Sequence, residues 1–108
     1  MIELLMAAAL YSSQGSMAAV NASRDAFSKC LRDAAQQAKT SSIKADAFPE
    51  FALQQCAAAG SRFKSALVTL DVANKVPRKQ AEEDAQVQID DYVAGSAESY
   101  QMMLNRGT

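Results

Sequence analysis

Hydrophobic residues recur at spacings of three and four along most of this 108-residue chain. That spacing places them on one face of an α-helix, with polar residues on the opposite face. Three ranges show the pattern, and we expect a helix in each: 16–40, 46–75 and 77–104. No run of alternating, β-branched residues is long enough to predict a strand. The sequence therefore predicts an all-α protein, an antiparallel bundle of three long helices that forms a single domain over residues 1–108.

The apolar spacing also predicts which side chains face inward. The expected inner faces are Val20, Ser23, Phe27, Cys30 and Ala34 in the first helix, Leu53, Cys56, Gly60, Phe63, Leu67, Leu70 and Asn74 in the second, and Ala81, Ala85, Ile89, Tyr92, Ser96, Tyr100 and Met103 in the third. In an antiparallel pair, the numbers of facing residues have a nearly constant sum. This register places Phe27 beside Gly60 and Tyr92, where small and large side chains fill the same layer.

Capping and breaking residues predict where the helices begin and end. Asp46 is the expected N-cap of the second helix, because Pro49 then falls near its first turn. Val76 precedes Pro77, and a residue before proline is disfavoured in helical geometry. We therefore expect the second helix to end there, with Asn74 as its C-cap.

Residues 1–15 allow two interpretations. Their apolar run, interrupted by Glu3, has the length of a signal-peptide core and is too short to span a bilayer. Ser13 and Gly15 are small residues at positions suited to cleavage before Ser16. No basic residue precedes the run, however, and this favours the alternative of an N-terminal helix that extends the first long helix or packs as a short fourth one.

Cys30 and Cys56 are the two cysteines of the chain, and both lie on predicted apolar faces. The antiparallel register brings them to the same height, so we expect a structural disulfide between them. Such bonds are typical of oxidising compartments. The alternatives are two reduced cysteines buried as small hydrophobic residues, or a redox-active pair.

Composition excludes several functions. The net charge is −1 and the isoelectric point about 5.3, which disfavours nucleic-acid binding through a basic surface. The absence of histidine rules out Ser–His or Cys–His catalysis within the chain, a Glu-x-x-His di-iron site and haem attachment at C-x-x-C-H. No glycine-rich phosphate loop is present. We expect no cofactor, no metal and no integral membrane span.

These observations predict a small non-enzymatic protein with an interaction or structural role. The cysteines favour a periplasmic or secreted location, with a cytoplasmic one as the alternative. An unidentified protein partner or a second copy of the chain is expected to bind its surface. The alternative function is binding of a small-molecule or lipid-like ligand in a cavity between helices. The residues expected to line such a ligand or partner groove are Phe63, Leu67, Ile89, Tyr92, Tyr100 and Met103.

Overall fold

The computed structural model describes residues 16–107, and the interpretations of residues 1–15 lie outside this range. The described elements are helix α2 (Met17–Thr40), the 3₁₀ turn η1 (Ala45–Ala47), and helices α3 (Phe48–Gln55), α4 (Ala57–Ala73) and α5 (Arg78–Arg106). No strand occurs within residues 16–107. The predicted all-α fold is confirmed.

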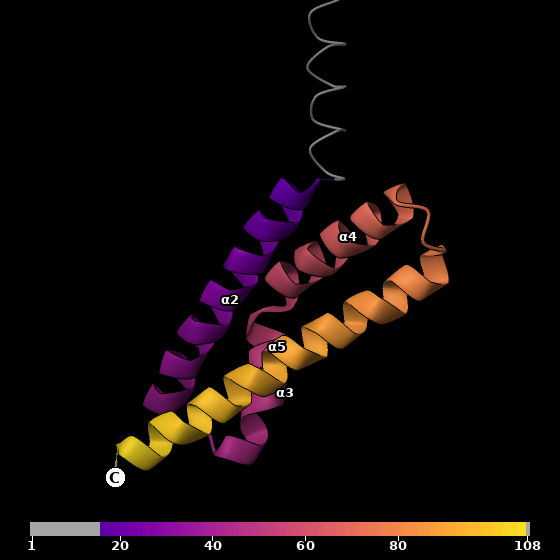
Figure 1. Cartoon of the computed structure of the whole chain (residues 1–108). Helices are drawn as coiled ribbons and strands as arrows, with labels where there is room; N and C mark the ends of the chain where they lie inside the picture. The colour runs from indigo at the N-terminus through magenta and orange to yellow at the C-terminus, as the bar shows by residue number, and fades with distance from the viewer. Residues whose placement is uncertain (1–15, 108) are drawn as a thin grey trace, which may run out of the picture.

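The helices form an antiparallel bundle that is closed at one end by η1 and α3 (Figure 1). The chain descends along α2, turns through η1 and α3, returns along α4 and descends again along α5 (Figure 1). Helix α4 packs against both α2 and α5, and α3 fills the space between α2 and α5 at the closed end. Helices α2 and α5 therefore run in the same direction, and their exposed sides border a shared surface.

Local hydrogen bonds explain where the long helices begin and end. The Ser16 hydroxyl oxygen accepts a hydrogen bond from the Ala19 N–H at 3.1 Å and so caps the start of α2. At the end of α4, Lys75 has a φ of 69° and the Val76 N–H donates to the Asp71 carbonyl at 2.9 Å. This is a Schellman motif with Asn74 as the C-cap, as predicted.

The prediction of one continuous second helix is wrong. Instead of one helix over 46–75, the chain forms α3 and α4, which are separated at Cys56. Cys56 has φ −110° and ψ 23°, and it serves as the C-cap of α3 and the N-cap of α4. The break changes the inward face: Ala52 is fully buried, whereas Leu53, predicted to face inward, is 45% exposed.

The predicted N-cap of that helix is also wrong. Asp46 lies inside the 3₁₀ turn η1, and α3 follows with Ala47 as an N-cap that makes no side-chain hydrogen bond. Phe48 begins α3 and is fully buried. Burial of this ring fixes the start of the helix, where the sequence pattern suggested a polar cap.

The core contains two groups of aromatic rings. The Phe27 cluster consists of Phe27, Phe63 and Tyr92, with the Phe27 ring centroid 6.0 Å from that of Phe63 and 6.1 Å from that of Tyr92. A Cβ placed on Gly60 would lie 3.2 Å from the Phe27 ring, so the predicted neighbours Phe27, Gly60 and Tyr92 do pack in one layer. The guanidinium of Arg24 covers the outer face of the Phe63 ring at 5.5 Å.

The Phe48 cluster consists of Phe48, Phe51 and Tyr100, and it joins α3 to α5. The Phe48 and Tyr100 rings stack with their centroids 4.5 Å apart. The Tyr100 hydroxyl donates a hydrogen bond to the carbonyl oxygen of Ile43, which lies in the turn after α2. Tyr100 is fully buried, and burial raises the pKa of its phenol above the ordinary value of 10.0.

Candidate functional site

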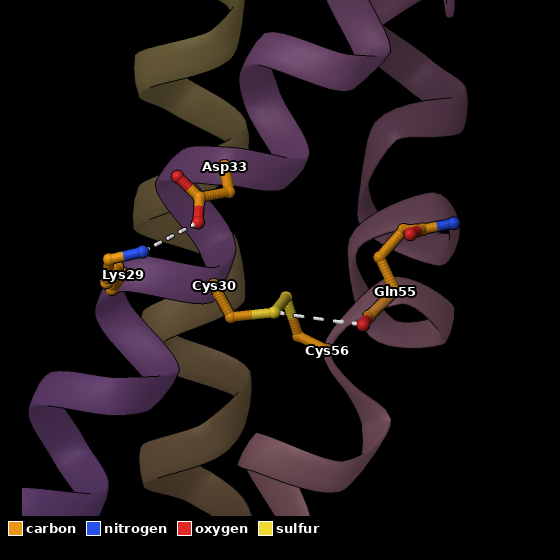
Figure 2. Close-up of a disulfide and its surroundings, with 5 residues drawn as sticks. All are labelled: Lys29, Cys30, Asp33, Gln55 and Cys56. Carbon is orange, nitrogen blue, oxygen red and sulfur yellow. Dashed lines mark hydrogen bonds and ion pairs between the residues drawn. A yellow bond between two sulfur atoms is a disulfide. The ribbon is translucent and has the colours of Figure 1, made fainter.

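The predicted disulfide joins the middle of α2 to the junction between α3 and α4 (Figure 2). The Cα atoms of Cys30 and Cys56 are 5.8 Å apart, a separation that suits a disulfide without movement of the backbone. Cys56 is 2% exposed, whereas Cys30 is half-buried. The bond lies at the break between the two shorter helices, so it holds that junction against α2.

Two polar contacts lie near the disulfide. The Cys30 Sγ lies 3.7 Å from the Gln55 carbonyl oxygen (Figure 2). A bonded sulfur carries no hydrogen, so this is a contact between sulfur and oxygen and not a hydrogen bond. On α2 beside Cys30, the Lys29 ammonium pairs with the Asp33 carboxylate at 3.2 Å (Figure 2). Both side chains are well exposed, so the pair stabilises the fold by about 0.5 kcal/mol or less.

Sequence analysis predicted six groove residues, and the structure places them in two different parts of the core. Phe63 and Tyr92 contact each other edge-on, with ring centroids 5.5 Å apart. Tyr100 belongs instead to the Phe48 cluster. Phe63, Leu67, Ile89 and Tyr100 are buried, while Tyr92 and Met103 are partly buried at the edge of the core. Most of the six therefore pack the interior, and parts of Tyr92 and Ile89 border surface depressions.

The first depression, the α2–α5 groove, follows the junction of the two parallel helices and has a volume of about 390 Å³. Its floor includes the buried Leu31 and the ring of Tyr92. Gly95 leaves it open, because a Cβ at this position would meet nothing within 4 Å. The lining residues are Ser28, Leu31, Arg32, Asp91, Tyr92, Gly95 and Ser96.

Two opposite charges border the α2–α5 groove. Arg32 comes from α2 and Asp91 from α5, and both are exposed. Within residues 16–107, the ion pairs at 4.0 Å or less are Lys29–Asp33 and Arg78–Glu82, so neither charge is neutralised by such a pair. The sequence pattern gave neither residue a role at a groove, because a charge outside an apolar face is typical of a solvated helix surface. The signal available was a charge beside each apolar face.

The second depression, the kink hollow, opens where α3 meets α4 on the other side of α5. Its volume is about 320 Å³, and the exposed Leu53 stands at its edge. The Lys64 ammonium donates a hydrogen bond to the Gln86 side-chain oxygen at 2.9 Å across its mouth. The lining residues are Phe27, Leu53, Cys56, Ala57, Gly60, Ser61, Lys64, Gln86 and Ile89.

Residues 16–107 contain no group of three or more cysteine or acidic side chains arranged to hold a metal ion. In the same range, no helix is both long enough and apolar enough to cross a bilayer.

Comparison with known proteins gave no match to a protein-family model, a curated protein or a solved structure.

Proposed function

We propose that this protein acts in an oxidising compartment, the periplasm or the outside of the cell, as a small non-enzymatic helical protein that works through its surface. The Cys30–Cys56 disulfide carries the proposal. Structural disulfides persist where thiols are not kept reduced and are rare in the cytosol. A small helical domain also gains most from such a bond, because it buries a limited apolar area.

The composition supports a role without catalysis. The chain has no histidine, the side chain most often used for proton transfer near neutral pH. The two grooves present apolar floors with few polar groups, a pattern that suits binding of a partner.

Intact mass spectrometry of protein from its native host tests the location. We expect the protein in the extracytoplasmic fraction, two hydrogens lighter than the reduced chain, with no alkylation by iodoacetamide until a reductant is added. A Cys30→Ala/Cys56→Ala variant is the matched control, because its alkylation must not change with reductant. Recovery from the cytosol with both thiols immediately alkylated would contradict the proposal.

A second candidate function is binding of a lipid-like ligand, and the kink hollow favours it. Phe27 and Ile89 give the hollow an apolar floor, and the Lys64 ammonium lies at its mouth. That arrangement suits a short acyl chain with an anionic head group.

Calorimetric titration with decanoate tests this second candidate. Binding that is lost in Leu53→Glu and weakened in Lys64→Gln would support it, because the first change puts a charge beside the acyl chain and the second removes the cation. Absence of binding to the wild-type protein at millimolar decanoate would exclude a ligand of this class.

A further inference from the structure

We propose that the α2–α5 groove is the contact surface of a symmetric homodimer, in which Arg32 of each copy pairs with Asp91 of the other. The proposal does not depend on the compartment in which the protein acts. It rests on the shape of the groove, on the placement of these two charges and on the exposed apolar side chains beside them.

A two-fold symmetric contact must be complementary to itself. When the two-fold axis runs along the groove, each point on the α2 border of one copy faces the α5 border of the other. Arg32 lies on the α2 border and Asp91 on the α5 border. Because Phe27 of α2 packs beside Tyr92 of α5, Arg32 lies more than one turn further along the groove than Asp91, and its long side chain spans this offset to form two equivalent Arg–Asp pairs. An axis across the groove would bring like charges together, so the charges also select the orientation of the two copies.

The floor of the groove allows close approach of a second helical surface. Gly95 has no side chain, and Ser28 and Ser96 beside it are small. The apolar part of the contact comes from the floor residues Leu31 and Tyr92. Small residues let helix backbones pack closely, and this increases van der Waals contact between copies.

The exposed apolar residues of α5 extend the same surface. Val87 lies one turn before Asp91, and Met102 lies two turns after Gly95, so helical spacing places both close to this border. They are 58% and 56% exposed. The seven residues that line the groove are fewer than a stable protein contact needs on each side, and these flanking residues supply further apolar area along α5.

Charge reversal followed by sedimentation equilibrium tests the proposal on the full, oxidised chain. We expect the wild type to dimerise with a Kd in the micromolar range, and Arg32→Asp or Asp91→Arg alone to raise that Kd at least ~10-fold, because each introduces two like-charge contacts. The double variant Arg32→Asp/Asp91→Arg should return to within about threefold of the wild-type Kd, a difference under about 1 kcal/mol.

An equimolar mixture of the two single variants gives the sharpest result. In the proposed symmetric dimer, the introduced acid faces the introduced arginine and the two remaining native charges face each other. The mixture should therefore form a heterodimer more tightly than either variant forms a homodimer. An Arg32–Asp91 interaction within one chain would not produce this rescue. Gly95→Trp should also abolish dimerisation while leaving the far-UV circular dichroism unchanged, because its side chain fills the groove.

Three results would overturn the proposal. The first is a wild-type protein that remains monomeric up to about 100 µM, a concentration at which a contact of micromolar Kd is mostly formed. The second is a dimer that neither single reversal weakens, because the contact would then lie on another surface. The third is failure of the mixed variants to associate.

Discussion

At the scale of single residues, Tyr100 joins parts of the chain that lie far apart in sequence. Its ring stacks on Phe48 and its hydroxyl donates to the Ile43 carbonyl, so one side chain holds the turn after α2, the start of α3 and the last turns of α5. We expect Tyr100→Phe to lower the free energy of unfolding by about 1 kcal/mol, because the partly buried Ile43 carbonyl oxygen loses its donor. Urea denaturation measures this, and Tyr92→Phe is the control. An equal effect of both changes would contradict the role of the hydroxyl.

The same residue predicts a dependence on alkaline pH. Burial raises the pKa of Tyr100 in the folded protein above its value in the unfolded chain. The folded state therefore keeps its proton at pH values where the unfolded state loses it. Its contribution to stability is complete below pH 10 and is lost as the pH rises through the folded-state pKa. The stability difference between wild type and Tyr100→Phe should shrink when urea titrations are repeated from pH 9 to pH 11.

Gly60 and Gly95 form a matched pair of helical glycines. A Cβ atom at Gly95 would have no other side chain within 4 Å. Gly95→Ala should therefore raise the free energy of unfolding by about 1 kcal/mol, because alanine favours the helix more than glycine does. Alanine at Gly60 would lie 3.2 Å from the Phe27 ring, which Phe63 and Tyr92 hold in place. Gly60→Ala should therefore be less stable than wild type by about 1 kcal/mol, since crowding outweighs propensity. Thermal denaturation of the two variants side by side tests the contrast.

At the scale of helices, the disulfide closes a 26-residue separation across the break at Cys56. The chain-entropy model gives about 3.5 kcal/mol for a loop of this length. We expect a reductant, or the Cys30→Ala/Cys56→Ala change, to lower the free energy of unfolding by that amount. Guanidinium denaturation with and without reductant measures it. Reductant should not change the free energy of unfolding of the double variant. If reductant also leaves the wild-type value unchanged, the disulfide does not constrain the unfolded chain as expected.

The helix scale also shows what could be predicted from the sequence. The spacing of Val20, Phe27 and Ala34 predicted α2 to within one residue, and the antiparallel register predicted the disulfide. The break at Cys56 was not predictable from local pattern. The three alanines after it are strong helix formers, and the apolar spacing continues through the break. The break depends instead on tertiary contacts, which a local pattern does not contain: the burial of Phe48 and Ala52 at the closed end and the bond from Cys56 to Cys30.

The candidate surfaces were harder to predict for a related reason. A buried face appears in the sequence as spaced apolar residues, and this is why the predicted groove residues proved to be mostly core. A groove depends on side chains that are small or absent where two helices diverge. Gly95 is a single glycine inside a helical pattern, and its significance depends on Leu31, which belongs to a different helix.

At the scale of the whole molecule, α5 separates two surfaces with different chemistry. The α2–α5 groove carries Arg32 and Asp91, whereas the kink hollow has the exposed Leu53 at its edge. We expect Leu53→Glu to leave the sedimentation behaviour unchanged and Arg32→Asp to leave any decanoate binding unchanged. A Leu53→Glu protein that loses dimerisation would show that the two surfaces are coupled or that the contact extends around α5.

The position of the disulfide also has a consequence for the order of folding during synthesis. Both cysteines leave the ribosome before any residue of α5 does, because they belong to α2 and the α3–α4 junction. Once in an oxidising environment, the hairpin of α2 and α4 can be covalently closed while Phe48 still lacks Tyr100 as its partner. Oxidation would then precede completion of the core, and α5 would dock onto a hairpin whose register is already fixed.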